Sequence, residues 1–133
     1  MRTCSKEQSD VFLKTSLLTL LTTVAAAWKG DMKGALCSLA IVGTSLNYWR
    51  YPVYGFRRNM DIATVSSCSV LNTYTSFYSS NQLYFLVLTY LAIMCYIINR
   101  YYQTIILHCM VHILGNMANV IMYRKINFVK LNG

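Results

Sequence analysis

Apolar residues gather in five runs along the chain, at positions 11–28, 35–49, 60–78, 83–98 and 104–123, and short polar stretches separate these runs. A helix needs about 20 mostly apolar residues to cross a bilayer, within a range near 17–25. The second and fourth runs are short, so their ends must lie among the headgroups or the bilayer must thin locally. The pattern predicts an all-α polytopic membrane helix bundle with five transmembrane helices, in which residues 1–133 form a single membrane domain.

The third run is more polar than the others. It holds several ionisable, hydroxyl and amide side chains, namely Asp61, Thr64, Ser66, Ser67, Ser69, Asn72, Thr73 and Thr75. Because such side chains hydrogen-bond between helices in membranes, we expect this run to lie inside the bundle, away from lipid. An alternative with four spans would leave the third run as a loop.

The first run raises the alternative of a cleaved signal peptide, because the three alanines at 25–27 resemble a cleavage site. The residues before this run include Glu7 and Asp10, however, which a basic leader would not carry. We therefore keep the run as a helix. Five spans place the two termini on opposite sides of the membrane. Seven of the 12 Lys and Arg residues fall on the N-terminal side, which predicts a cytosolic N-terminus.

Composition and charge agree with a membrane location. The chain is 56% hydrophobic and 12% charged, whereas soluble domains carry roughly 25% charged residues. Its net charge of +8 is distributed in short clusters between the apolar runs, so we expect membrane lipids as partners and no nucleic acid. The five cysteines show no CxxC spacing that would indicate a disulfide or a metal motif. We expect an integral membrane protein of an endomembrane or a viral membrane.

The last run contains two histidines, His108 and His112, whose spacing of four residues places them on one face of a helix. Such a pair can hold one metal ion through both imidazoles. A structural alternative is hydrogen bonding between helices, with Ser45, Ser66 or Asn72 as partners.

The order of the spans brings two more candidates to the same membrane face. Ser45 ends the second run, Asp61 begins the third, and His108 lies about one turn inside the fifth, given a rise of about 1.5 Å per residue. Asp61 has the structural alternative of a helix N-cap, and Ser45 that of a small residue packed between helices. The functional hypothesis is that Asp61 faces the histidine pair.

These residues resemble the motifs of the CREST superfamily of membrane hydrolases, which includes alkaline ceramidases, adiponectin-receptor-like proteins and GPI-lipid remodelling proteins. The resemblance rests on Ser45 followed by an aromatic residue and Arg50, on Asp61 at the start of the next run, and on the pair His108 and His112. It implies a seven-helix bundle whose serine, aspartate and three histidines form a zinc site, where activated water attacks lipid amides or esters. It makes Ser45 and Asp61 candidate catalytic residues.

The chain departs from the family pattern in two ways. It has five apolar runs, and Trp49 stands where the family has its first histidine. His108, His112 and Asp61 are then the candidate zinc ligands. If Trp49 occupies a former ligand position, its side chain is expected to face the histidines.

The expected function is therefore that of a compact metal-dependent lipid hydrolase or of a protein with a degenerate site of this kind. The alternatives are a non-catalytic membrane scaffold or assembly protein and, third, a small channel or transporter. The sequence leaves open whether the protein is an enzyme.

Overall fold

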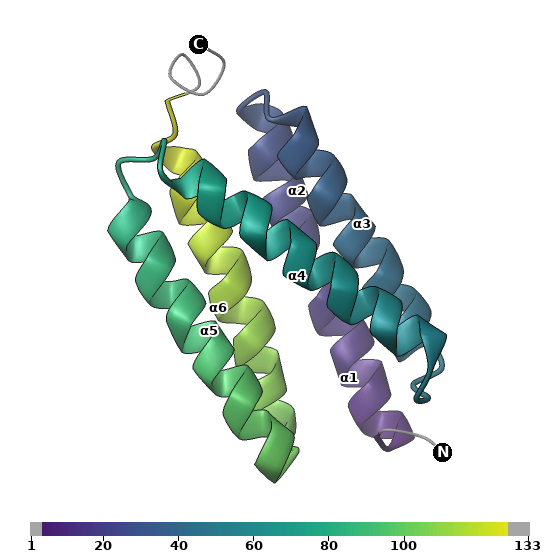
Figure 1. Ribbon diagram of the computed structural model, residues 1–133. Helices are drawn as coiled ribbons and strands as arrows, with labels where there is room; N and C mark the ends of the chain where they lie inside the picture. Colours follow the sequence, from purple (N-terminus) through teal and green to yellow (C-terminus); the bar gives the residue numbers. More distant parts are fainter. Residues whose placement is uncertain (1–3, 128–133) are drawn as a thin grey trace.

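The computed structural model describes residues 4–127, and these residues form six helices and one isolated bridge between Ser79 and Ile126. The helices are α1 (Lys6–Ser16), α2 (Thr19–Trp28), α3 (Met32–Trp49), α4 (Phe56–Ser76), α5 (Gln82–Tyr102) and α6 (Ile105–Arg124) (Figure 1). The predicted all-α helical bundle is confirmed.

Helices α1 and α2 form one rod that is interrupted at Leu17 and Leu18. The amides of these two leucines bond to carbonyls three residues back, which is the tighter 3₁₀ pattern. Just before the break, the Ser16 hydroxyl donates to the Phe12 carbonyl at 2.8 Å. Hydroxyl groups that bond to their own helix backbone in this way compete with the regular ladder and often bend a helix. The first predicted run therefore forms a single bent helical segment.

The helices pack so that segments far apart in the sequence meet at the ends of the bundle. Helix α5 packs along α6, α2 lies against both α3 and α6, and α1 contacts α3 and α6. The start of α1, the α3–α4 connection and the α5–α6 connection gather at one end, and the α2–α3 turn and the end of α6 lie at the other (Figure 1). The chain thus enters and leaves the described bundle at opposite ends, as an odd number of passes predicts.

The buried core is small, and much of the apolar surface is exposed. One buried cluster comprises Ala26, Ala35, Phe85, Ala118, Met122 and Tyr123, and a second comprises Phe12, Tyr48 and Trp49. Large apolar side chains on α5, such as Leu83 and Tyr90, point outward and are exposed. Among residues 4–127, the segments Lys6–Trp28, Gln82–Tyr102 and Ile105–Arg124 are long and apolar enough to cross a membrane.

The expectation that the third run lies inside the bundle is wrong. It forms α4, which is a continuous helix and not a loop, but Ser66, Ser67 and Ser69 are exposed. Helix α4 packs mainly on α3 and crosses the outside of the bundle (Figure 1). Helix α6, and not α4, packs directly against both α2 and α5. Neither α3 nor α4 is among the three segments that are apolar enough to span.

Candidate functional site

Asp61 is held by the helix that precedes it in the chain. Its Oδ1 atom accepts a hydrogen bond of 2.6 Å from the Ser45 hydroxyl and one of 3.1 Å from the Thr44 hydroxyl. Helix α4 begins after Gly55, so Asp61 lies in its second turn and is not the N-cap residue. The N-cap alternative for Asp61 is wrong, and the expected proximity of Ser45 and Asp61 is confirmed.

The two histidines contact each other. His108 Nε2 and His112 Nε2 are 3.1 Å apart, and the ring centroids are separated by 4.9 Å. Two neutral imidazoles can make this contact only if one nitrogen donates and the other accepts. The described hydrogen bonds of these rings do not reach Ser45, Ser66 or Asn72, which were the partners of the structural alternative. The helical spacing therefore places both nitrogens on one face of α6, as the sequence predicts.

Trp49 packs directly against the first histidine. It is the last residue of α3, its side chain is 8% exposed, and its ring meets the His108 ring edge-on with centroids 4.9 Å apart. Phe12 from α1 contacts both rings, T-shaped to Trp49 with centroids 4.8 Å apart and tilted over His108 with centroids 4.0 Å apart. The Ser9 hydroxyl donates to the Trp49 carbonyl and joins α1 to the end of α3. The prediction that Trp49 faces the histidines is confirmed for His108.

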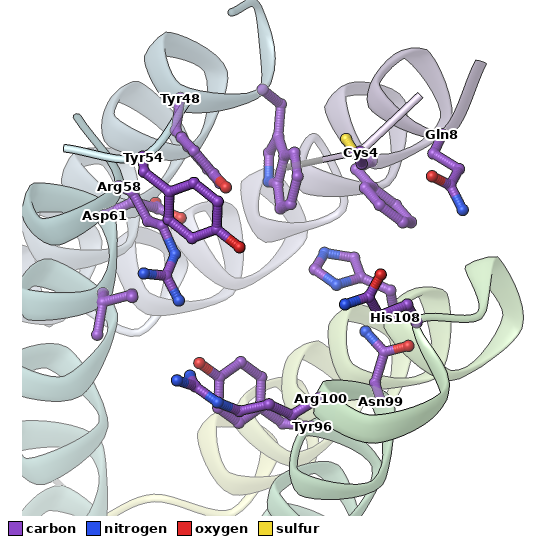
Figure 2. Close-up of a pocket in the computed structure, with 14 residues that line it drawn as sticks. Cys4, Gln8, Tyr48, Tyr54, Arg58, Asp61, Tyr96, Asn99, Arg100 and His108 are labelled. Atoms are coloured by element: carbon purple, nitrogen blue, oxygen red, sulfur yellow. The ribbon is translucent and has the colours of Figure 1, made fainter. Parts of the chain in front are cut away.

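A cavity of about 310 Å³ opens at this end of the bundle and connects the candidates (Figure 2). Trp49, Asp61 and His108 all line it, whereas Ser45 and His112 are not among its lining residues. Its other lining residues come from the segment before α1, from α1, α3, α4 and α5, and from the connections between helices: Cys4, Gln8, Phe12, Tyr48, Tyr54, Arg58, Ile62, Tyr96, Asn99, Arg100 and Gln103. Of the four residues that span order places together, Asp61 and His108 therefore share one cavity.

The structure adds residues that the sequence did not single out. Gln8, Asn99 and Gln103 place amide groups at the cavity: Gln8 lies in the first turn of α1, and Asn99 and Gln103 lie at the end of the largely apolar helix α5. An amide beside the end of an apolar run, as at Asn99 and Gln103, is the sequence signal for a residue that lines a cavity at the end of the bundle. The lining arginines, Arg58 and Arg100, come from α4 and α5.

The donor set does not fit a catalytic zinc site with three protein ligands. Zinc lies about 2.0–2.1 Å from histidine nitrogens, so two ligating nitrogens in a tetrahedron are about 3.3 Å apart. The 3.1 Å between His108 and His112 is close to that spacing. Within residues 4–127, however, no three His, Cys, Asp or Glu side chains come together as a ligand set. Asp61 does not join the histidines as the expected third ligand, and its described bonds are to hydroxyls.

Away from the cavity, buried polar contacts of Asn116 and Tyr123 connect α6 to the first half of the chain. Asn116 accepts from the Thr22 hydroxyl at 2.8 Å and donates to Thr19 at 3.3 Å, and all three residues are buried. The Tyr123 hydroxyl donates at 2.9 Å to Asp31, whose other oxygen caps α3. These contacts fix how the last helix lies against α2 and α3.

Comparison with known proteins found no match among protein-family models, curated proteins or solved structures. The resemblance to the CREST superfamily thus rests on the residues of this chain alone.

Proposed function

We propose that this protein is a multi-pass membrane protein whose terminal cavity binds a membrane lipid without hydrolysing it. The observation that carries this proposal is the position of Trp49. Its buried ring lies against His108, where the CREST pattern would place a third imidazole. An indole offers only an N–H donor and no ligand atom for a metal.

The membrane placement is supported by the three long apolar segments and by the outward-facing apolar side chains of α5 and α6. We propose that α3 and α4 also cross, which gives five spans and a cytosolic N-terminus. Helix α3 has 18 residues and α4 has 21, enough to reach most of the way across a bilayer at about 1.5 Å per residue. The cavity would then lie at the depth of the lipid headgroups on the N-terminal side.

The lack of hydrolysis follows from the donor set. Catalytic zinc sites use three protein ligands and leave one position open for water. Only His108 lines this cavity; its ring contacts His112, and the Asp61 carboxylate is engaged by Ser45 and Thr44. On this proposal, the polar recess binds lipid and its residues no longer form a complete metal site.

The test uses the purified full chain in detergent with short-chain ceramide and short-chain phospholipids. We expect saturable binding of at least one of these lipids and no release of fatty acid or of headgroup. Trp49→His is expected to bind about one zinc ion per chain, because it would complete a three-imidazole set. Trp49→Phe is the matched control, since it keeps an aromatic ring without adding a ligand and is expected to gain no zinc.

A metal-dependent lipid hydrolase is the second candidate, and the 3.1 Å approach of the two histidine nitrogens favours it. It predicts that the wild-type chain binds zinc and cleaves a lipid amide or ester. Both properties would be lost in His108→Ala and in His112→Ala. Zinc-dependent cleavage by the wild type would refute the non-catalytic proposal and establish this alternative.

A further inference from the structure

A second recess lies beside the α3–α4 connection, at the same end of the bundle as the cavity of Figure 2 (Figure 1). Its described lining residues are Asn47, Arg50, Tyr51 and Arg57, and its volume is about 450 Å³. All four residues are exposed, so a ligand can reach them from outside the bundle. Arg57 and Arg58 are neighbours in the chain, yet Arg57 lines this recess and Arg58 lines the cavity.

The recess is lined by two guanidinium groups and, within residues 4–127, by no carboxylate. The chain has four acidic residues, all of them in this described part, and none is among the lining residues. Asp61 follows Arg57 by one turn of α4, but its described hydrogen bonds come from the hydroxyls of Ser45 and Thr44. The recess therefore carries two positive charges that no acidic lining residue neutralises.

The start of α4 adds to this positive charge. Within the described residues, α4 begins after Gly55 without a side-chain cap and without an acidic residue in its first turn. The N-terminus of a helix carries a partial positive charge that favours anions and disfavours cations. Arg57 nevertheless lies in this first turn and lines the recess. An anion bound there would compensate both the guanidinium group and the end of the helix.

Exposed aromatic side chains around the recess support a position at the membrane interface. Tyr51, Tyr54 and Phe56 belong to the α3–α4 connection and the first residue of α4, and they are 53%, 58% and 79% exposed. Aromatic side chains with a polar tip are enriched at the level of the lipid headgroups. The five-span topology assigns the same depth to this end of the bundle. The anionic groups that a membrane offers at this depth are the phosphates of its lipids.

From the charge, exposure and position of this recess, we infer that it binds the phosphomonoester headgroup of a membrane lipid. Each guanidinium offers forked N–H donors that fit phosphate oxygens, so Arg50 at the end of α3 and Arg57 at the start of α4 hold the phosphate between them.

The charge selects the class of headgroup. A phosphomonoester carries a charge of about −1.5 to −2 at pH 7, which matches the two arginines. A phosphodiester has a single negative charge, and a zwitterionic headgroup has no net charge to match them. The volume of about 450 Å³ lies within the roughly 300–1,000 Å³ of small-molecule sites. The site is separate from the cavity of the proposed function and rests on that proposal only for its depth in the membrane.

The charge requirement is tested by binding of three short-chain lipids to the full chain in detergent. Dihexanoyl-phosphatidic acid is a phosphomonoester, dihexanoyl-phosphatidylglycerol is a phosphodiester with a single charge, and dihexanoyl-phosphatidylcholine is zwitterionic. We expect phosphatidic acid to bind most tightly and phosphatidylcholine most weakly. Equal affinity for the first two lipids would contradict the phosphomonoester assignment, and equal affinity for all three would contradict an anion site.

The two arginines are tested by Arg50→Gln and Arg57→Gln. Each is expected to weaken binding of phosphatidic acid about five-fold, the usual effect of one basic residue on binding to anionic lipid. Arg124→Gln is the matched control, since it removes the same charge from an exposed residue at the opposite end of the bundle. It is expected to bind like the wild type, and equal weakening by all three variants would overturn the inference. If Arg57→Gln does not fold, Arg57→Lys serves in its place, because it keeps the charge and loses the two-pronged contact.

Two further measurements locate the phosphate and identify its source. If Arg58→Gln loses the preference for phosphatidic acid while Arg57→Gln keeps it, the phosphate lies in the cavity of Figure 2 and the inference is wrong. Soluble glycerol phosphate is expected to bind much more weakly than phosphatidic acid, and equal affinity would overturn the assignment to a lipid. Loss of the headgroup preference with lipid binding intact would leave the proposed function standing. Lipid cleavage with the preference intact would remove only the proposed function.

Discussion

The Ser45 hydroxyl donates a hydrogen bond of 2.6 Å to Asp61 Oδ1 and thereby ties the last turn of α3 to the second turn of α4. Thr44 adds a second, longer bond to the same oxygen. Asp61, at the start of the third apolar run, is thus hydrogen-bonded to two residues of the preceding helix, α3. The contact fixes the approach of α4 to α3 beside the cavity.

Replacing Ser45 is expected to lower stability because the Asp61 carboxylate would lose its shortest hydrogen bond. Ser45→Ala should reduce the free energy of unfolding by about 1.5–3 kcal/mol, the usual contribution of a bond to a charged group. The measurement is denaturant unfolding in detergent. Ser69→Ala is the control, since that exposed hydroxyl bonds only to a carbonyl of its own helix, that of Val65. The double change of Ser45→Ala with Asp61→Asn should cost less than the two single changes added together, and strict additivity would contradict the pairing.

The Asn116 contacts predict a modest loss when only one partner is removed. Asn116→Leu leaves the Thr22 hydroxyl without its acceptor in a buried position. A loss of about 1 kcal/mol is expected, as for other hydrogen bonds between membrane helices. Combining it with Thr22→Val should recover part of that loss, because the Thr22 hydroxyl is then removed together with its acceptor, and only Thr19 still loses the Asn116 contact. Thermal unfolding of Asn116→Leu, Thr22→Val and the double variant tests this contact. A double variant that is no more stable than Asn116→Leu would contradict it.

Two glycines of α3 are expected to respond in opposite ways to the same substitution. A Cβ at Gly34 would clash with the Tyr123 hydroxyl and the Asp31 carboxylate, whereas a Cβ at Gly43 meets open space. Gly43→Ala should therefore stabilise the helix by about 0.5–1 kcal/mol. Gly34→Ala should destabilise the protein, and Tyr123→Phe should relieve part of that clash. Equal melting temperatures for the two alanine variants would contradict the close packing of α6 on the α2–α3 turn.

The topology predicts that the two ends of the chain lie on opposite sides of the membrane. Tags at the N-terminus and the C-terminus should be accessible to protease from different sides of sealed vesicles, with the N-terminal tag on the cytosolic side. The physical reason is an odd number of crossings. If both tags are cleaved from the same side, the five-span proposal is wrong. Span order would then no longer place the cavity at the depth of the headgroups.

Helix periodicity and span order make several features of the candidate site predictable from the sequence. The four-residue spacing puts His108 and His112 on one face of α6, and the reversal of direction at each connection brings Asp61 and His108 to one end. These are consequences of local geometry, which depends on neighbours in the chain. The expectation for Trp49 comes instead from the resemblance to the CREST pattern, which has a histidine at that position, and the structure places Trp49 at the end of α3 beside His108.

The sequence by itself thus determined the helices, their order and the end of the bundle at which the polar candidates meet. Only the tertiary structure decided which side chains are partners. Asp61 bonds to Ser45 and Thr44 and joins no metal-ligand set with the histidines among the described residues. The sequence also could not predict that α4 lies outside the bundle. The hydroxyl groups of a polar helix can bond to carbonyls of the same helix, as those of Ser69 and Thr73 do, so they do not require an interior position. Whether a helix is interior depends on which other helices fill the space, and here α6 already packs against both α2 and α5.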